Sequence, residues 1–289
     1  TISLSRKKLH YAFDHGITHF DLANNYGPSY GSAEETFGQI MKLSFAPYRD
    51  ELFISTKAGH DMWPGPYGNW GSRKHLMASL DQSLKRMNLD YVDVFYSHRY
   101  DPDTPLEETL QALVDIVRKG KALYVGLSKY PLDAYLFACR YLKERDVPCL
   151  LYQGRYSMLV REPESQGILN AVKENGSGFV AFSPLAQGLL TNRYLNGIPD
   201  DSRIARGGFL KKEALTPEVL GKIQALNERA AMRGQSLAEM DLAWLLKNET
   251  VTSVIVGASS VEQLGDSLKT LNHLSFEEEE LHAIEKILM

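Results

Sequence analysis

Four residues in the first third of the chain combine types that could transfer a proton to a substrate. Asp21, Lys57 and His98 each lie at the end of a short apolar run typical of a β-strand, and Tyr26 follows Asp21 by five residues. Each has an ordinary structural explanation: a strand-end aspartate is often a turn residue, and Tyr26 is one of 15 tyrosines. Lys57 is harder to explain in that way, because lysines are rarely buried without a partner. Asp21, on the neighbouring strand, would be that partner.

Together these residue types suit the protonation of a carbonyl oxygen. An isolated phenol titrates at about 10, so it is a poor acid at neutral pH. A neighbouring cation such as Lys57 stabilises the phenolate form, and Asp21 would hold that lysine in place. His98 would orient the carbonyl oxygen or share in the proton transfer. No Ser/His/Asp or Cys/His arrangement in the sequence forms an equally consistent set of catalytic residues.

These residues need a scaffold that brings strand ends together, and the apolar pattern predicts one. Seven short runs rich in β-branched and aromatic residues indicate strands, and their near-continuous apolarity favours a parallel sheet covered on both faces. The runs span residues 18–23, 52–58, 91–98, 122–128, 149–153, 178–184 and 252–258. Helical patterns fill the intervals between them. Helix start signals lie at Ser32, Thr104, Thr216, Ser236 and Ser275.

Alternating strands and helices allow either an open doubly wound sheet or a barrel. No strand is followed by GxGxxG or GxxxxGK, which weighs against an open nucleotide-binding sheet. Nearly every strand ends in a polar residue, as expected where strand ends converge on the active face of a TIM barrel. We therefore predict an α/β fold, a (β/α)8 TIM barrel, as a single domain over residues 1–289. A barrel has eight strands, so the first strand is expected to be missing from the sequence.

Composition narrows the possible functions. Lys and Arg number 32 against 36 Asp and Glu, and the resulting net charge of −4 weighs against nucleic acid as a partner. No apolar run is long enough for a transmembrane helix, so no membrane partner is expected. Two cysteines, Cys139 and Cys149, cannot build a disulfide scaffold, which favours a reducing, cytoplasmic location. His60 and His75 lack partners at metal-ligand spacing, so we predict no metal.

Several segments, in their order and spacing, resemble aldo-keto reductases. The resemblance covers essentially the whole chain and is carried by HFDLANNYG, STKAG, YSHR, LYQ, AFSPLAQGLLTNRY and IVGASSVEQL. The most similar branch contains bacterial L-glyceraldehyde 3-phosphate reductase-like enzymes and potassium-channel β subunits. This resemblance implies a catalytic tetrad of Asp21, Tyr26, Lys57 and His98. It also implies that Tyr26 is the general acid and that NADPH gives a hydride directly to the carbonyl carbon.

The same resemblance implies a set of residues that bind NADPH/NADP. Ser128 and Gln153 match positions that hold the nicotinamide carboxamide, and Phe182 matches the aromatic side chain that stacks on the nicotinamide ring. Lys129 stands where the family often has asparagine. The other matches lie in segments around the pyrophosphate and the adenosine: Ser183, Leu185, Gln187, Gly188, Arg193, Arg203, Gly257, Ser259, Gln263 and Asp266. Their arginines and their Ser/Gln character suit a 2′-phosphate, so NADP is expected over NAD.

The loop after the second strand supplies candidate substrate contacts. Three aromatic residues, Trp63, Tyr67 and Trp70, stand where barrel loops line a substrate pocket, although a loop packed on its own side chains would carry the same residues. Arg99 would meet an anionic substrate or form a salt bridge with Asp101 or Asp103. The resemblance implies a small carbonyl substrate, with glyceraldehyde 3-phosphate and methylglyoxal as examples.

A second function class stays open. In the channel-associated branch a reductase barrel serves as a redox-sensing regulatory partner, so the chain could be an NADP-binding subunit of a larger complex. The complete tetrad favours retained catalysis without excluding that role. The branch also implies a homo-oligomer, either a ring-like tetramer or an octamer.

Overall fold

The structure is a computed structural model that describes residues 2–195, 197–200 and 212–289. The chain divides into two compact units. The first contains Thr1–Gln153 and Gly167–Phe179, and the second contains Gly154–Gln166 and Val180–Met289. The chain therefore passes from one unit to the other after Gln153, after Gln166 and after Phe179.

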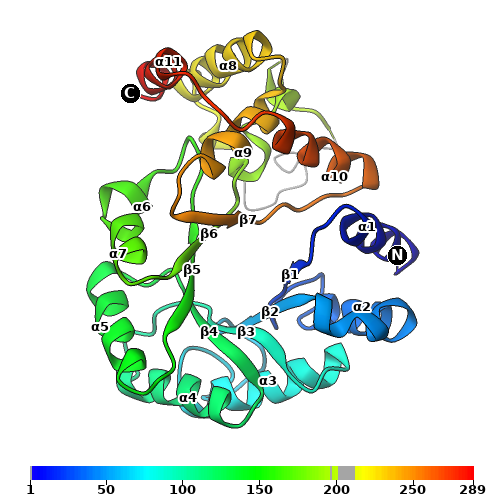
Figure 1. Cartoon of the computed structure of the whole chain (residues 1–289), viewed down its shortest axis with the longest axis vertical. Helices are drawn as coiled ribbons and strands as arrows, with labels where there is room; N and C mark the ends of the chain where they lie inside the picture. The colour runs from blue at the N-terminus through cyan, green and yellow to red at the C-terminus, as the bar shows by residue number, and fades with distance from the viewer. Residues whose placement is uncertain (1, 196, 201–211) are drawn as a thin grey trace. The chain divides into compact units, whose positions relative to one another are not determined.

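The first unit is a series of strand–helix repeats (Figure 1). Its strands are β1 His19–Asp21, β2 Phe53–Ala58, β3 Val92–Ser97, β4 Ala122–Ser128 and β5 Cys149–Arg155, the last of which continues into the second unit. Its helices are α1 Ile2–Asp14, α2 Ser32–Ile40, α3 Arg73–Met87, α4 Leu106–Arg118, α5 Leu132–Lys143 and α7 Ile168–Glu174, with the π-helix η1 Met41–Phe45 and the 3₁₀ helix η2 Ala46–Glu51.

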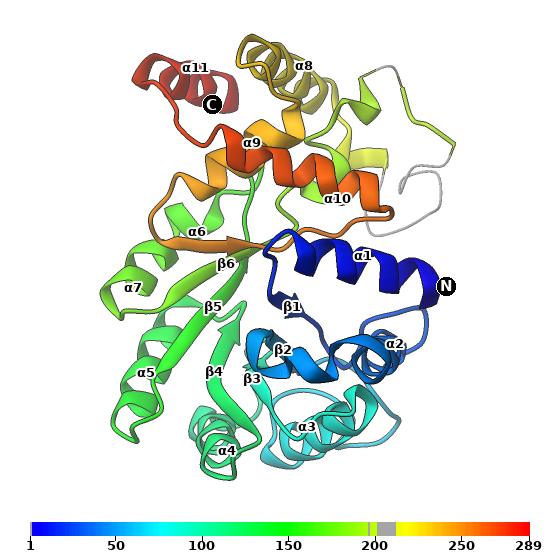
Figure 2. The same cartoon turned by 45° about the vertical axis from the view of Figure 1, so that its right-hand side comes forward.

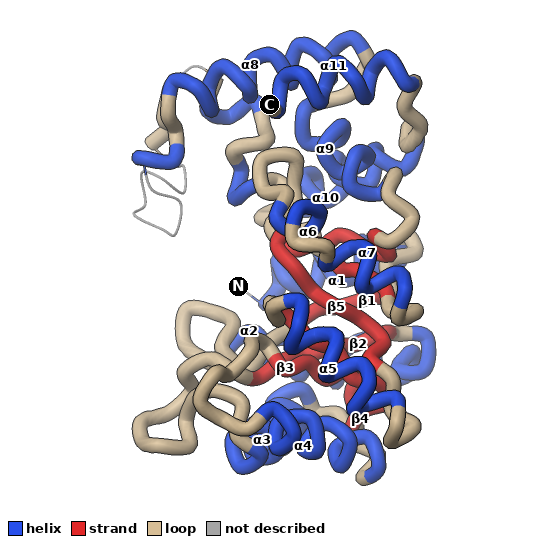
Figure 3. The backbone as a smooth tube through the Cα atoms, turned by 90° about the vertical axis from the view of Figure 1, so that its left-hand side faces the viewer, coloured by secondary structure: helices blue, strands red, loops and turns tan. Residues whose placement is uncertain are grey.

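The strands of the first unit pair in parallel and in chain order. The pairing of β2 with β3 sets Lys57 opposite Tyr96, and the pairing of β4 with β5 sets Ser128 opposite Gln153. Helix α3 packs on β2 and β3, and α4 packs on β3 and β4 (Figure 3). Because parallel strands share one direction, their carboxyl ends and the polar residues there lie at the same edge of the sheet.

A glycine allows β3 and β4 to pack closely beside this edge. A Cβ atom on Gly126 would lie 2.4 Å from two ring carbons of Tyr96, so any side chain there would displace the ring. Tyr96 is completely buried, and its ring centroid lies 5.5 Å from Nζ of Lys57. Gly126 therefore makes room for the aromatic ring that borders the buried lysine.

The second unit holds the remaining elements, with α11 beside α8 (Figure 2). Its strands are β6 Gly178–Phe182, which begins in the first unit, and β7 Val251–Val254. Its α-helices are α6 Glu162–Ser165, α8 Pro217–Met232, α9 Leu237–Leu246, α10 Val261–Leu268 and α11 Glu278–Leu288. Its 3₁₀ helices are η3 Ala186–Gly188, η4 Asn192–Tyr194, η5 Lys212–Ala214 and η6 Lys269–Asn272. After β7, the Ile255 N–H donates to the Ala181 carbonyl at 2.8 Å.

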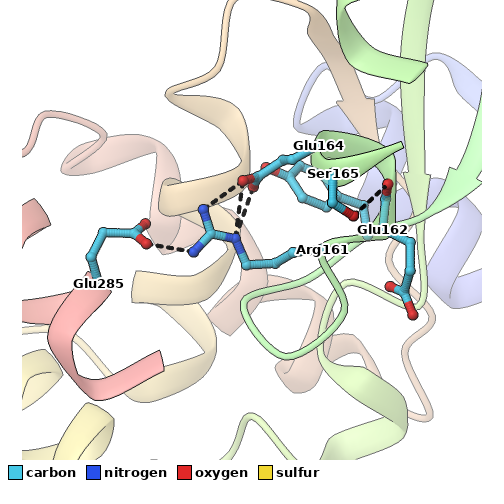
Figure 4. A network of polar contacts seen from close by, with 6 residues as sticks. Arg161, Glu162, Glu164, Ser165 and Glu285 are labelled. Atoms are coloured by element: carbon cyan, nitrogen blue, oxygen red, sulfur yellow. Dashed lines mark hydrogen bonds and ion pairs between the residues drawn. The ribbon is translucent and has the colours of Figure 1, made fainter. Parts of the chain in front are cut away.

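An arginine joins three helices of the second unit (Figure 4). Arg161, just before α6, forms ion pairs with Glu164 of α6 and Glu285 of α11. Its guanidinium carbon also lies 5.3 Å from the ring centroid of Trp244 in α9. The hydrogen bonds to Glu164 and Glu285 raise the pKa of Arg161. Arg161 therefore has a structural role in fixing these helices.

The seven predicted strands are confirmed, and helices alternate with them as expected. The described residues contain no eighth strand, so the closed (β/α)8 barrel stays a prediction. The single domain over 1–289 also stays a prediction, because the contacts divide the chain into two compact units.

Two of the five predicted helix starts are confirmed. Thr216 and Ser236 accept hydrogen bonds from backbone N–H groups in the first turns of α8 and α9. The other three differ by one or two residues, since Gly31, Pro105 and Glu277 occupy the N-cap positions of α2, α4 and α11.

Candidate active site

Three of the four predicted catalytic residues lie at the carboxyl ends of adjacent strands in the first unit. Asp21 ends β1, Lys57 lies near the end of β2, and His98 directly follows β3. Tyr26 lies in the loop after β1, where its N–H donates to the Ala23 carbonyl at 3.1 Å. The parallel register thus gathers residues that are far apart in the sequence.

Lys57 is completely buried, and its ammonium group is paired. Its Nζ lies 2.5 Å from Oδ2 of Asp21, whose side chain is only 6% exposed. The same Nζ lies 5.1 Å from the ring centroid of Tyr26. A buried charge needs close pairing and further hydrogen bonds to remain stable. Asp21 therefore fixes a positive charge beside the phenol.

Tyr26 is the most exposed of the four predicted catalytic residues. It is 37% exposed, whereas His98 is only 6% exposed. The two rings meet edge to face, with their centroids 6.0 Å apart. A carbonyl oxygen that accepts a hydrogen bond from Tyr26 would therefore lie close to the His98 imidazole.

Asp21 is held by a hydrogen-bond network that the sequence did not reveal. Its Oδ1 accepts a hydrogen bond from Ser55 Oγ at 2.7 Å and another from Gln153 Nε2 at 3.1 Å. The Ser55 hydroxyl in turn lies 3.0 Å from Nε2 of His19. One signal was present, because Ser55 precedes Lys57 by two residues and alternate residues of a strand share one face. Ser55 and His19 are therefore positioning residues for the Asp21–Lys57 pair.

The surroundings keep His98 neutral. Burial lowers the pKa of its imidazole far below the usual value, and the charges of Lys57, Lys129 and Arg99 lower it further. A neutral imidazole donates a hydrogen bond through one nitrogen but has no acidic proton to release at neutral pH. Of the two roles predicted for His98, the geometry and the charges favour orientation of the carbonyl oxygen.

We expect the free energy of unfolding to decrease as the pH is lowered from about 7.5 to about 5.5. Burial lowers the folded-state pKa of His19, His60, His75 and His98, that of His60 to about 4. The unfolded state therefore binds protons that the folded state does not, and the stability present above about 6.5 is lost below it. Each histidine contributes at most about 1.4 kcal/mol per pH unit, less where it is partly exposed.

Urea unfolding at the two pH values measures this effect, and a flat profile would contradict it. Asp241 supplies a control of opposite sign, because burial raises the pKa of its carboxyl group well above the usual value. Asp241 therefore takes up a proton on folding, and its contribution to stability increases as the pH falls towards about 4. The Asp241→Asn variant should lose stability more steeply than the wild type over the same range.

The predicted substrate residues lie in loops of the first unit. Trp63 packs on His75 with ring centroids 5.0 Å apart, so this part of the loop is packed on its own side chains. Arg99 has no carboxylate within ion-pair distance in the part of the chain that the structure describes. The alternative salt bridge to Asp101 or Asp103 is therefore not formed.

Ser128 and Gln153 lie side by side at the ends of β4 and β5. Ser128 is 1% exposed, and its Oγ has no hydrogen-bond partner among the described residues. The Asn24 amide, between Asp21 and Tyr26 in sequence, is also buried without a partner there. Buried polar groups are normally hydrogen-bonded, and a carboxamide could both donate to and accept from such groups. Ser128 therefore fits its predicted role, and Asn24 is a candidate that the sequence did not reveal.

The predicted pyrophosphate loop follows β6 in the second unit. Ser183 and Gln187 have φ angles of 52° and 61°, in the left-handed region that non-glycine residues rarely adopt. Such conformations cost about 1–3 kcal/mol each and concentrate at ligand sites. The predicted residues of this segment are Phe182, which ends β6, then Ser183, Leu185, Gln187, Gly188 and Arg193 of η4.

The predicted adenosine motif lies at the start of α10. The Ser259 N–H and hydroxyl both donate to Oε1 of Gln263, at 2.7 and 2.8 Å. Gly257 precedes this turn, and Asp266 forms an ion pair with Lys269 at 2.7 Å. Arg203 falls outside the described residues.

A search of the described ranges identifies no group of three or more His, Cys, Asp or Glu residues that could hold a metal ion. In the same ranges, no helix has the length and apolarity needed to cross a membrane.

Comparison with known proteins identifies the family of the chain. The model of the Aldo/keto reductase family matches residues 3–289. The chain is 57% identical over 286 residues to L-glyceraldehyde 3-phosphate reductase of Escherichia coli O157:H7, covering 97% of this chain and 82% of that protein. It is 37% identical over 266 residues to a probable voltage-gated potassium channel subunit beta of Arabidopsis thaliana, covering 90% and 79%. A putative subunit of the same kind in Schizosaccharomyces pombe is 34% identical over 278 residues, covering 92% and 78%. The chain therefore belongs to the aldo/keto reductase family.

Proposed function

We propose that this oxidoreductase reduces small aldehydes to alcohols with NADPH, and that Tyr26 is its general acid. The observation that carries the proposal is the buried Lys57–Asp21 ion pair, whose ammonium lies 5.1 Å from the Tyr26 ring centroid. Two Escherichia coli relatives are named as reductases of an aldehyde, L-glyceraldehyde 3-phosphate. We infer that substrates of this class, including glyceraldehyde 3-phosphate and methylglyoxal, fit the site.

The residues of the first unit have different roles in the proposed reaction. Tyr26 donates its proton to the carbonyl oxygen, and the charge of Lys57 stabilises the phenolate that remains. Asp21 keeps the ammonium group in place, and the neutral His98 donates a hydrogen bond that orients the same oxygen. When bound, NADPH supplies the hydride for the carbonyl carbon. The Ser128 hydroxyl, which has no hydrogen-bond partner among the described residues, would hold the carboxamide of the cofactor.

NADPH oxidation measured against a panel of aldehydes tests the proposal. The panel contains glyceraldehyde 3-phosphate, glyceraldehyde, methylglyoxal and an aromatic aldehyde. We expect turnover of at least one small aldehyde and formation of the corresponding alcohol. Absence of turnover across the panel, with both NADPH and NADH, would contradict the proposed reaction.

We expect NADPH to bind about 10- to 100-fold more tightly than NADH, because hydrogen bonds to a charged 2′-phosphate are among the stronger ones. Arg193 and Gln263 are the described residues proposed to contact that phosphate, together with Arg203. Quenching of protein fluorescence by each cofactor measures both dissociation constants. Arg193→Ala should weaken NADPH binding and leave NADH binding nearly unchanged. Arg229→Ala, on an exposed position of α8, is the matched control. Equal affinities for the two cofactors would contradict the assignment.

The channel-subunit relatives support a second candidate, an NADP-binding regulatory subunit. The two functions differ in what a preparation from the native cell would contain. A co-purifying partner together with negligible turnover would favour the regulatory role, whereas turnover of small aldehydes by the isolated chain favours the enzyme.

A further inference from the structure

His98 lacks the hydrogen bond that usually sets the orientation of a functional imidazole. Its Nδ1 is buried and has no hydrogen-bond partner among the described residues. In most functional histidines, a hydrogen bond from one ring nitrogen to a carbonyl or carboxylate fixes which nitrogen is protonated. Because a substrate cannot reach the buried Nδ1, the nitrogen that donates to a carbonyl oxygen would be Nε2. The orientation of this ring therefore depends on the side chains packed against it.

The imidazole of His60 packs directly on that of His98. The ring centroids lie 4.4 Å apart and the ring planes are at 89°, so the two rings meet edge to face. This geometry is one that aromatic pairs favour. The Tyr26 ring also meets His98 edge to face, at a centroid distance of 6.0 Å. His60 is therefore the nearer of the two rings that restrict the His98 side chain.

The backbone before His60 is joined closely to the segment that carries His98. The φ angle of Gly59 is 150°, and a Cβ atom there would lie 3.2 Å from the Cβ of His98. Glycine tolerates both the angle and the close approach. The Ala58 carbonyl accepts a hydrogen bond from the His98 N–H at 2.9 Å. The Gly59 carbonyl accepts one from Nε of Arg99 at 2.8 Å. These contacts hold the two segments together at consecutive residues.

Lys129 holds the His60 ring from its other contact. The Lys129 N–H donates to the Gln153 carbonyl at 3.2 Å, and its Nζ lies 3.1 Å from Nε2 of His60. Burial, together with Lys129 and Arg99, lowers the pKa of His60 to about 4, although Asp61 acts in the opposite direction. The imidazole is thus neutral at neutral pH, and an ammonium group can only donate. Nε2 of His60 therefore accepts this hydrogen bond, and the ring proton of His60 is on Nδ1.

Charged groups from several segments face the two imidazoles. The side chains that lower the pKa of His98, in addition to burial, are all basic groups: Lys57, His60, Lys129 and Arg99. Two carboxylates act in the opposite direction. Asp61 raises the pKa of His60 and of Arg99, and Asp101 raises that of Arg99. Neither carboxylate outweighs burial and the basic groups, so both imidazoles are neutral at neutral pH.

We propose that His60 and Lys129 are positioning residues for His98: the ammonium group fixes the His60 ring, and that ring fixes the imidazole that meets the carbonyl oxygen. The inference rests on the proposed carbonyl reduction and adds two residues to its site. Both residues act through His98 and not on the reacting atoms. Misplacement of a reacting group by about 1 Å can lower a rate about 100-fold, so loss of this support should be measurable.

A double-mutant cycle on His60 and His98 tests the proposal. The quantity measured is the single-turnover rate with saturating NADPH and the small aldehyde that the wild type reduces fastest. We expect His60→Ala to lower this rate about 10- to 100-fold. In a His98→Ala background the same change should have almost no further effect, because the group that it positions is gone. His15→Ala, at an exposed position after α1, is the matched control.

Either of two results of this cycle would overturn the proposal. An equal loss with and without His98 would mean that His60 acts on the substrate directly or only through the general packing of the site. An unchanged rate for His60→Ala would mean that His98 needs no support from His60.

A second cycle tests whether Lys129 acts through His60. His60→Phe keeps an aromatic ring against His98 but cannot accept the hydrogen bond, so it should lose less activity than His60→Ala. Lys129→Met should lower the rate in the wild type and have almost no further effect in His60→Phe. Lys143→Met, at an exposed position of α5, is the matched control. The same loss in both backgrounds would show that Lys129 acts on the substrate or the cofactor, contrary to the proposal.

NMR of the histidine rings in the free protein tests the contact without any turnover. Nitrogen chemical shifts distinguish a protonated from an unprotonated ring nitrogen. We expect His60 to be protonated on Nδ1 and to stay neutral down to about pH 5, since its pKa is about 4. Lys129→Met should raise this pKa, because a nearby cation is lost, and should allow both tautomers. An unchanged tautomer and pKa would overturn the role of Lys129. Absence of turnover with every aldehyde would instead contradict the proposed function, whereas this measurement decides the contact independently.

Discussion

Tyr26→Phe is expected to lower kcat for aldehyde reduction by about 10²–10⁴-fold, the usual effect of losing one positioned acid. The substitution removes only the hydroxyl, so the ring would keep its edge-to-face contact with His98. The Lys57–Asp21 ion pair does not involve the phenol oxygen. We therefore expect NADPH to bind the variant nearly as tightly as the wild type, with a nearly unchanged melting temperature.

Single-turnover kinetics with bound NADPH measure this loss directly. Tyr30→Phe is the matched control, because Tyr30 lies in the same loop and is 58% exposed. Its hydroxyl has no proposed role, so its kcat should equal that of the wild type. Wild-type turnover by Tyr26→Phe would show that another group donates the proton.

Lys57→Met is expected to lower both activity and stability. The substitution keeps a similar side-chain volume but leaves the Asp21 carboxylate buried without its partner. Breaking one half of a buried ion pair costs about 3–5 kcal/mol. Turnover should fall as well, because the phenolate of Tyr26 would lose the charge that stabilises it.

Urea unfolding of a double-mutant cycle separates these two effects. Asp21→Asn combined with Lys57→Met removes both charges, so the double variant should be more stable than Lys57→Met alone. Its turnover should nevertheless stay as low as that of Lys57→Met, because the cation beside Tyr26 is still absent. Lys85→Met, at an exposed position of α3, is the matched control for the lysine substitution. Unchanged stability of Lys57→Met would mean that the ion pair contributes nothing to folding, and unchanged turnover would remove Lys57 from the mechanism.

The strands and the catalytic ion pair could be predicted because they follow from local pattern and from charge. Each strand is a short apolar run, and Lys57 lies within one of them, where an ammonium group requires a partner. Asp21 was the carboxylate at the end of the neighbouring predicted strand. These arguments need only residue type and the order of the strands.

Contacts fixed by the fold could not be predicted in this way. Gln153 reaches Asp21 across 132 residues, and Lys129 reaches His60 across 69. Such pairs depend on strand register and on backbone angles that no local pattern specifies. Helix starts also depend on which of several nearby groups a side chain binds. The Ser32 hydroxyl, for example, donates to the Ser29 carbonyl and does not cap α2.

The order in which the chain builds its two units has a consequence for synthesis. Residues Gly167–Phe179, with α7, belong to the first unit, although they follow Gly154–Gln166 of the second. Helix α7 packs on α5, so a nascent chain that ends at Gln153 leaves that face of α5 uncovered. Proteins emerge from the ribosome at about 5–20 residues per second and fold in units as these are completed. The first unit therefore completes its packing only after Phe179 has emerged, and until then the nascent chain has exposed apolar surface for chaperones to bind.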